Sequence, residues 1–240
     1  MSKMEYLISR ASKLGFSLNP GQLEQFDSYY RELIDWNQRI NLTSITDFKE
    51  VQLRHFLDSL TVTLAGQQLS DARMIDVGTG AGMPGLPLKI LFPNIRLVLL
   101  EATAKKAAFL IHVIERLGLD DVEVVVGRAE EVAHQSQHRE KFDMVLSRAV
   151  AQLATLVELT LPFCRIGGRF IAQKKGFIDP EVSRAAKVIG LMGGKLLEVK
   201  RVNLEGLADR RLVIIGKVSP TPEKYPRRPG IPAKRPLGVA

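Results

Sequence analysis

The sequence predicts an α/β protein built on a mainly parallel sheet and preceded by a helical extension. From residue 72 onward, short apolar runs alternate with helical segments, which is typical of a parallel sheet with helices on both faces. Residues 1–70 instead place apolar side chains at three- and four-residue spacing, the pattern of helices. A hydrophobic content of 45% with 25% charged residues is sufficient for a packed core.

The first 70 residues are expected to form helices that pack on the following domain. Asn19 is placed to cap a helix whose first turn contains Pro20 and which ends near Asn41. A second helix is expected to start near Asp47, where apolar residues again recur at helical spacing. A shorter helix is expected in the first dozen residues.

Seven strands are expected in the remainder of the chain. Five runs are so continuously apolar that we expect none to be half-exposed: residues 73–80, 95–102, 122–129, 142–149 and 169–175. Two further strands, near 195–204 and 210–219, are expected to form an antiparallel hairpin at the edge of the sheet. We therefore divide the chain into a helical extension (1–70), an α/β domain (71–218) and a tail (219–240).

The net charge of +8 is unevenly distributed. Residues 161–240 carry 17 basic and 6 acidic side chains, whereas residues 1–160 have a small acidic excess. The tail holds six of the twelve prolines and five basic residues, so we expect it to be extended or loosely draped. A one-sided basic field attracts phosphate polymers, although a merely soluble surface has the same composition.

Composition excludes several classes of protein. One cysteine cannot form a disulfide framework, and four dispersed histidines do not suggest a metal site. No apolar run approaches the roughly 18 to 20 residues that a membrane span needs. We expect a cytoplasmic protein without metal or membrane contacts. We also expect a monomer, because the core needs all the apolar stripes.

The most informative segment follows the first predicted strand. It reads Asp76-Val77-Gly78-Thr79-Gly80-Ala81-Gly82-Met83-Pro84-Gly85. In α/β sheets, ligands lie at the carboxyl ends of strands, and glycines let a ligand approach the main chain. A Walker phosphate loop needs a Lys-Ser/Thr pair that this loop lacks, and the dinucleotide fingerprint matches only out of phase. A structural tight turn remains an alternative.

Charged residues follow other strands at the same edge. Glu101 ends the second strand, where a carboxylate can accept both hydroxyls of a ribose. Glu130 follows the third strand, where an adenine would lie, and Arg148 follows the fourth. Each could alone be a solvated charge or a structural ion pair. Their joint placement favours a nucleoside-containing ligand.

Several motifs together resemble the glucose-inhibited division protein B family, also called RsmG, over residues 37–236. They are Asn41-Leu42-Thr43, Arg54-His55-x-x-Asp58-Ser59-Leu60, the glycine loop, Ser147-Arg148-Ala149, Gly167-Gly168-Arg169-Phe170 and Tyr225-Pro226-Arg227-Arg228-Pro229-Gly230-Ile231-Pro232. The resemblance implies a class I S-adenosylmethionine-dependent methyltransferase, Rossmann-like, with a mainly parallel seven-stranded sheet and an N-terminal helical extension. The implied reaction moves the methyl of S-adenosylmethionine to N7 of a guanosine in 16S ribosomal RNA and leaves S-adenosylhomocysteine. The implied partner is that RNA, the 30S subunit or its precursor.

The resemblance also implies cofactor contacts at matching positions, namely Gly78, Met83, Glu101, Ala129, Glu130 and Arg148. Gly78 and Met83 would contact the methionyl and ribose parts, and residues 129–130 the adenine. Arg148 would lie beside the cofactor at the substrate mouth. Many members have Asp-Ser where this chain has Glu101-Ala102, which keeps a carboxylate at this position.

Guanine N7 carries a free lone pair, so no general base is needed and catalysis would be positioning. The positioning candidates are Arg148, Lys174, Lys175 and His55. RNA contacts are expected at Arg54, Lys174, Lys175, Arg227, Arg228, Lys234 and Arg235. Arg54 is equally compatible with an ion pair to Asp58 one helical turn away. Cys164 is interpreted as a packing residue. Truncation after Gly216 is expected to leave cofactor affinity nearly intact while it weakens RNA binding and flattens its salt dependence.

Two alternatives from other classes remain open. A nicotinamide-dependent dehydrogenase would use the out-of-phase glycine pattern. A non-enzymatic RNA-binding protein would keep the basic tail and have no use for the glycine loop.

Overall fold

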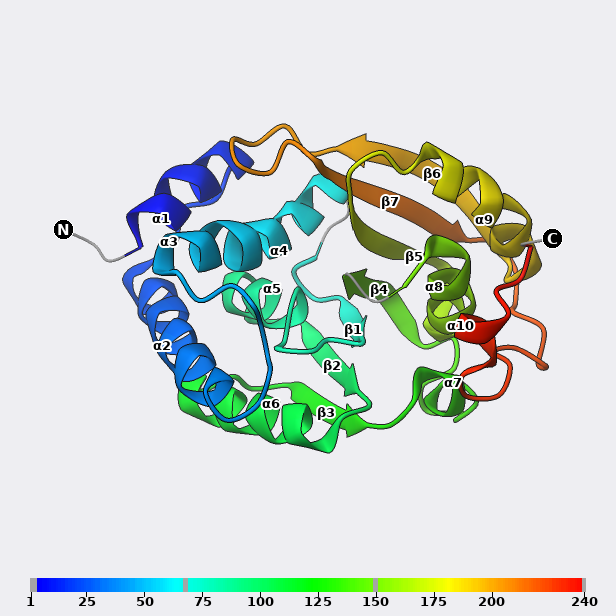
Figure 1. Cartoon of the computed structure of the whole chain (residues 1–240), viewed down its shortest axis with the longest axis horizontal. Helices are drawn as coiled ribbons and strands as arrows, with labels where there is room; N and C mark the ends of the chain where they lie inside the picture. The colour runs from blue at the N-terminus through cyan, green and yellow to red at the C-terminus, as the bar shows by residue number, and fades with distance from the viewer. Residues whose placement is uncertain (1–3, 67–68, 149–150, 239–240) are drawn as a thin grey trace.

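The computed structural model describes residues 4–66, 69–148 and 151–238 (Figure 1). Its α-helices are α1 (Glu5–Ala11), α2 (Pro20–Asn37), α3 (Phe48–Val51), α4 (Asp58–Leu60), α5 (Gly85–Leu91), α6 (Ala104–Leu117), α7 (Ala129–Val132), α8 (Leu153–Thr160), α9 (Asp179–Leu191) and α10 (Ile231–Lys234). Its strands are β1 (Arg73–Val77), β2 (Arg96–Glu101), β3 (Val122–Val126), β4 (Phe142–Arg148), β5 (Cys164–Lys175), β6 (Gly194–Arg201) and β7 (Arg210–Lys217). None of the helices in these ranges is both long and apolar enough to cross a membrane.

Over the described residues, seven strands form one sheet in the order β3-β2-β1-β4-β5-β7-β6. The first five strands pair in parallel, and β7 runs antiparallel to both β5 and β6. The predicted hairpin is present. Strand β7 lies between β5 and β6, so β6 forms the edge of the sheet opposite to β3. Because the carboxyl ends of parallel strands meet at one edge, the loops after β1, β2 and β4 lie together.

The two faces of the sheet enter two separate cores. On β1, Met74 belongs to the core shared with the extension, α5 and α6, whereas Ile75 belongs to the core shared with α8 and α9. This alternation follows from the two-residue period of a strand. In Figure 1 the extension and α6 cover one face, and α8 and α9 cover the other.

Helix α2 begins where the sequence predicts, with a reciprocal cap. The Asn19 side chain accepts from Gln22 N at 2.9 Å, and the Gln22 side chain accepts from Asn19 N at 3.0 Å. The helix ends at Asn37, earlier than expected. The Asn37 side chain accepts the backbone N–H groups of Leu42 and Thr43, both at 2.9 Å, and so turns the chain toward the carboxyl edge of the sheet.

The second predicted helix also starts at its expected cap, since Asp47 accepts from Glu50 N at 2.9 Å. It is not uniform. α3 passes into a π-helical segment, Gln52–Leu57, then into α4 and a 3₁₀ segment, Thr61–Ala65. A π turn inserts one extra residue per turn and redirects the side chains beyond it, which is common at functional sites. Arg54 and His55 lie on this turn.

Strand β3 corrects one expectation, because its apolar run is not fully buried. Its residues are intermediate or exposed, and Val126 is 54% exposed. The cause is its place at the edge of the sheet, where it has one neighbouring strand. Continuous apolar sequence therefore overstated the burial of this strand.

The tail is a second correction, because it is docked rather than loosely draped. Arg139 donates to the carbonyls of Thr221 and Tyr225, both at 2.9 Å, and the Thr155 hydroxyl donates to Pro232 O at 3.1 Å. Tyr225 is only 8% exposed and belongs to the core of α8 and α9. The prolines shape a segment that packs against α7 and α8.

Candidate functional site

The glycine loop connects β1 to α5 and is organised by the buried carboxylate of Asp76. This carboxylate accepts from the Thr79 hydroxyl at 2.7 Å and from Gly85 N at 2.9 Å. Burial raises the pKa of Asp76 to about 6, against the opposing effect of these hydrogen bonds. A Cβ on Gly85 would lie 2.8 Å from a Leu99 methyl and 3.1 Å from the Asp76 carboxylate, so this position has no room for a side chain.

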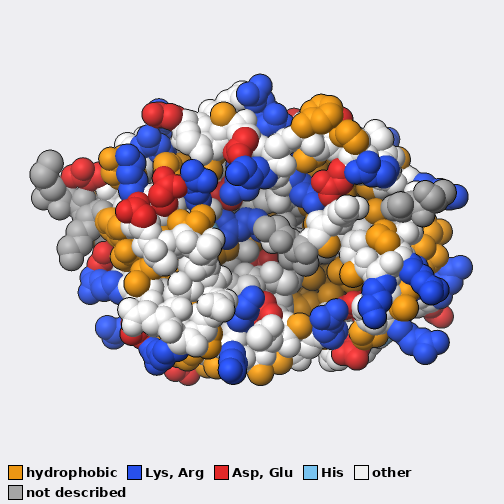
Figure 2. Space-filling view, viewed as in Figure 1, with side chains coloured by type: hydrophobic (Ala, Val, Ile, Leu, Met, Phe, Trp, Pro, Cys, Tyr) orange, Lys and Arg blue, Asp and Glu red, His pale blue; other side chains and the backbone are white. Residues whose placement is uncertain are grey.

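The loop borders a cavity of about 490 Å³ at the carboxyl edge of the sheet. Its lining residues are Leu42, Thr43, His55, Gly78, Thr79, Gly80, Ala81, Met83, Glu101, Ala102, Thr103, Lys106, Arg128 and Arg148. A second hollow, of about 130 Å³, shares Gly78, Ala102 and Arg128 with it and is further lined by residues 129–130. Figure 2 shows Lys and Arg side chains around the depression in the middle of this face. The six predicted cofactor contacts therefore line these two adjoining hollows, which we call the cleft.

Glu101 is 7% exposed and is fixed at the end of β2 by two backbone donors. Its carboxylate oxygens accept from Gly80 N at 3.0 Å and from Thr103 N at 2.9 Å. Each oxygen retains a lone pair, because a carboxylate has about four acceptor sites. The side chain can therefore hold the glycine loop and still accept the hydroxyls of a ribose.

Glu130 follows β3 and lies in the smaller hollow, but its carboxylate has an additional role. One oxygen accepts from Gly230 N in the tail at 3.0 Å and lies 3.3 Å from the Arg128 guanidinium. The tail is thereby tied to the part of the cleft expected to hold the adenine. The backbone of residues 129–130 borders the same hollow.

Arg148, at the end of β4, is the best-anchored cation of the cleft, with a side chain 13% exposed. Its guanidinium donates to the Arg54 carbonyl at 3.1 Å and to the Asp58 carboxylate at 3.3 Å. Asp58 is fully buried and also forms an ion pair with Arg210 on β7, at 3.1 Å. The extension, β4 and β7 therefore meet in one charge cluster, which no local sequence pattern indicates. Ala149, part of the predicted motif, lies outside the described residues.

His55 lines the same cavity. Its Nε2 lies 2.7 Å from the Thr43 hydroxyl, and its Nδ1 lies 3.4 Å from the Arg148 guanidinium. Burial and the positive charge of Arg148 lower the pKa of His55 to about 4. The imidazole is therefore neutral at physiological pH, and it can orient neighbours without adding charge to the site.

Two of the predicted RNA contacts form ion pairs within the protein. Lys174 donates to Ala151 O and pairs with Glu181, both at 2.7 Å, and only 11% of its side chain is exposed. Arg227 is paired with the fully buried Glu158. Both head groups are therefore engaged in internal ion pairs in this structure, and a contact from either of them to a phosphate stays a prediction.

The other predicted RNA contacts keep exposed side chains. Arg54 pairs with Glu50 rather than with Asp58, which corrects the expected direction of its helical pair. Lys175 lies 3.4 Å from Asp209 and is 61% exposed. Arg228, Lys234 and Arg235 lie exposed on the docked tail. Cys164 is buried, and burial raises its thiol pKa to about 12, as a packing role requires.

Several lining residues carry little or no signal in the sequence. Thr43 reaches the cavity because the Asn37 side chain turns the chain after α2. Lys106 and Arg128 lie after β2 and β3, where strand-end position is the only sequence signal for them. Asp58 stands in the motif Arg54-His55-x-x-Asp58-Ser59-Leu60, but no sequence signal indicates that it pairs with Arg148 and Arg210.

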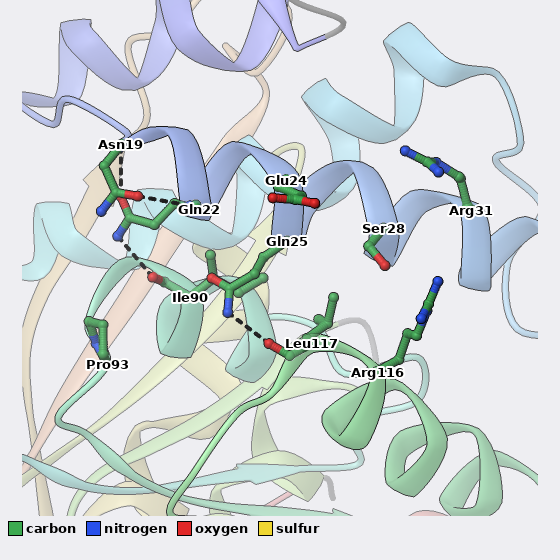
Figure 3. Close-up of a pocket in the computed structure, with 11 residues that line it drawn as sticks. Asn19, Gln22, Glu24, Gln25, Ser28, Arg31, Ile90, Pro93, Arg116 and Leu117 are labelled. Carbon is green, nitrogen blue, oxygen red and sulfur yellow. Dashed lines mark hydrogen bonds between the residues drawn. The ribbon is translucent and has the colours of Figure 1, made fainter.

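A larger hollow of about 540 Å³ lies elsewhere, between α2, α5 and α6 (Figure 3). There the Gln22 and Gln25 side chains donate to the carbonyls of Ile90 and Leu117, both at 2.9 Å. These polar groups join the extension to the sheet domain. The glycine loop and the strand-end charges lie at the other hollow, which we take as the functional site.

Comparison with known proteins identifies the family of this chain. A sequence profile described as GidB, rRNA small subunit methyltransferase G, matches residues 22–213. A protein of Dehalococcoides mccartyi strain BAV1 named "Ribosomal RNA small subunit methyltransferase G" is 57% identical over 98% of this chain and 100% of its own length. A protein of the same name from Roseiflexus castenholzii is 53% identical over 98% and 100% of the two chains.

Solved structures agree on the fold. A SAM-dependent methyltransferase from Aquifex aeolicus has a TM-score of 0.54 at 16% identity, covering 70% of this chain and 93% of that chain. Precorrin-6y C5,15-methyltransferase from Geobacter metallireducens has a TM-score of 0.51 at 16% identity, over 75% and 92%. The sheet is that of the class I S-adenosylmethionine-dependent methyltransferases, and the chain belongs to the GidB family, rRNA small subunit methyltransferase G.

Proposed function

We propose that this protein transfers a methyl group from S-adenosylmethionine to N7 of a guanosine in 16S ribosomal RNA. One observation carries the proposal: the glycine loop, Glu101 and Arg148 line one cleft in a chain of this family. The family match also removes the reason to prefer a nicotinamide cofactor for the loop.

The residues of the cleft fit S-adenosylmethionine. A Cβ built on Gly80 meets no atom within 4 Å, so the loop is open to a ligand there. Glu101 offers acceptor sites for a ribose, and the smaller hollow beside residues 129–130 is bordered by the apolar side chains of Leu100 and Leu159, which suits an adenine. Gly78 and Met83 would then lie beside the ribose and methionyl parts.

The residues of the cleft would catalyse the reaction by positioning the two reactants. S-adenosylmethionine supplies an electrophilic methyl carbon, to which the N7 lone pair bonds as the carbon–sulfur bond breaks, leaving S-adenosylhomocysteine. No residue has to remove a proton. This agrees with a pKa of about 4 for His55, which makes its imidazole a weak base, and with a pKa of about 12 for Cys164, which keeps its thiol protonated. Holding base and methyl in line supplies up to roughly 7 to 11 kcal/mol in favourable cases.

The RNA would approach the face that carries the cleft. The base must leave its stack to reach the methyl, which is easiest in single-stranded or loosely paired RNA. Exposed cations available for its phosphates are Arg54, Lys175, Arg228, Lys234 and Arg235. The substrate would be 16S RNA, the 30S subunit or its precursor, bound by a cytoplasmic monomer.

The deciding experiment incubates the protein with labelled S-adenosylmethionine and either unmodified 30S subunits or unmodified 16S RNA. Digestion to nucleosides should give labelled 7-methylguanosine from at least one substrate. Label in another nucleoside, or in none, would refute the proposal. Calorimetric titration should show binding of S-adenosylmethionine and not of NADH, and RNA binding without either cofactor would favour the non-enzymatic alternative.

A matched pair of glycine variants ties the activity to the cleft. Gly85→Ala places a Cβ against Asp76 and Leu99 and should abolish cofactor binding. Gly190→Ala, in α9, meets no atom within 4 Å and should leave both binding and methylation unchanged. Equal behaviour of the two variants would show that the loop is only a structural turn.

A further inference from the structure

Arg148 is held in a fixed orientation by groups that all belong to the extension. Its Nη1 donates to Arg54 O at 3.1 Å and to the Asp58 carboxylate at 3.3 Å, and its Nη2 lies 3.4 Å from His55 Nδ1. The Asp58 carboxylate is fully buried and also forms an ion pair with Arg210 at 3.1 Å. The extension thus holds the guanidinium from one side, and the side chain also lines the cavity, where a ligand can contact it.

These contacts do not use all the donors of the side chain. A guanidinium has five N–H groups and no acceptor. Among the described residues, Arg54, Asp58 and His55 engage at most three of them. The Nε–H and at least one Nη2–H of Arg148 therefore remain for a ligand in the cleft.

The chemistry of these donors selects an oxygen next to the methylated atom. The edge of guanine that carries N7 also carries O6, an acceptor, whereas adenine has an amino donor at that position. Arginine is the commonest partner of this guanine edge and usually contacts both O6 and N7. Here N7 must keep its lone pair for the methyl group. The unused Nε–H and Nη2–H of Arg148 would therefore bond to O6 alone, which has two lone pairs.

We propose that Arg148 donates a hydrogen bond to O6 of the target guanine and thereby makes the site specific for guanine over adenine. Asp58 is the positioning residue that keeps the guanidinium aimed. The inference rests on the proposed methylation at N7 and adds to it the group that recognises the base. It explains why the extension is built into the cleft, since removal of Asp58 would free the guanidinium to turn toward solvent.

The test uses base analogues at the methylated position, which is first mapped in the wild-type reaction. Inosine keeps O6 and N7 but lacks the 2-amino group, whereas 2-aminopurine keeps N7 and the 2-amino group but lacks O6. The measured quantity is the ratio of kcat/KM for the inosine RNA to that for the 2-aminopurine RNA. Dividing the wild-type ratio by the variant ratio cancels the different intrinsic reactivity of N7 in the two bases.

We expect Arg148→Met to lower this ratio by about 5-fold or more, because a contact to O6 alone corresponds to the lower end of the discrimination that a two-bond base contact provides. Asp58→Asn should lower it by a smaller factor, while Arg148→Lys, which can still donate, should keep part of it. Arg116→Met, in the last turn of α6 at the hollow between α2, α5 and α6, should leave it unchanged. A purely structural role for Arg148 would slow both substrates alike and leave the ratio as in the wild type, which would overturn the inference.

The experiment also separates an inactive Arg148→Met variant from a failure of the proposed function itself. If Arg148→Met has no turnover, the same ratio is read from equilibrium binding of the two RNAs in the presence of S-adenosylhomocysteine, with thermal unfolding as the check of folding. If the wild-type protein forms no 7-methylguanosine, the proposed function fails. If it does so and the ratio is insensitive to Arg148, only the inference fails.

Discussion

Replacing Arg227 by alanine is expected to destabilise the protein by about 3 kcal/mol, whereas the same change at its neighbour Arg228 is expected to cost less than about 0.5 kcal/mol. The two residues are identical in type and adjacent in sequence. Arg227 donates to the two Glu158 carboxylate oxygens at 2.8 and 2.7 Å, and this carboxylate is fully buried. Arg228 is exposed.

The magnitude follows from what is left behind. Removing one partner of a buried ion pair costs about 3 to 5 kcal/mol because the other charge stays buried without compensation. In the Arg227→Ala variant, the backbone N–H of residue 227 still donates to Glu158 at 2.9 Å, which favours the lower end. For a chain of this size the expected fall in Tm is about 6 to 12 °C.

The assay is urea unfolding of the full chain, followed by circular dichroism, for both single variants. Adding Glu158→Gln to Arg227→Ala should recover part of the loss, because it removes the uncompensated charge. If Arg227→Ala and Arg228→Ala fall within about 0.5 kcal/mol of each other, the ion pair does not stabilise the tail and the reasoning is refuted.

Four further outcomes are expected. The docked tail reverses the expectation that its loss would spare cofactor binding: removal of residues 219–240 should weaken S-adenosylmethionine binding as measured by calorimetry, because the tail ties down Glu130 through Gly230 N. Unchanged affinity would show that the tail acts on RNA alone. Glu101→Gln should weaken the same binding by about 10-fold or more with RNA affinity unchanged, because a charged acceptor is lost. His55→Gln should flatten the pH dependence of the free energy of unfolding. The pKa of His55 is about 4 in the folded protein and near 6.5 in the unfolded chain, so the wild type loses about 2 to 3 kcal/mol of stability as the pH falls from 6.5 to 4.5. The variant should not show this loss. Cys164→Ala should retain kcat within a few-fold in the methylation assay, and a larger loss would indicate a nucleophilic thiol.

The sequence pattern locates the parts of the site that depend on strand ends. Strand position is visible in the apolar pattern, and parallel topology brings strand ends to one edge, so the pattern alone groups Gly78, Glu101 and Arg148. It does not predict their exact arrangement. Asp58 and Arg210 lie 90 and 62 positions from Arg148, and their meeting depends on the packing of the extension and on the placement of β7 beside β5.

The excess of basic residues in the last third of the sequence is the least reliable of the sequence signals for RNA-contacting side chains, and the reason is physical. A sequence count treats each Lys and Arg as a surface charge, but a buried acid must be paired, and it takes a cation out of that count. Glu158 does so with Arg227. Lys217 leaves the count for a different reason, because it is itself fully buried and pairs with the partly exposed Glu140 at 3.0 Å. A signal is present: Glu158 is the one charged residue in the apolar segment 153–163. A lone acid in such a helix predicts a buried partner elsewhere in the chain, and the docked tail supplies it.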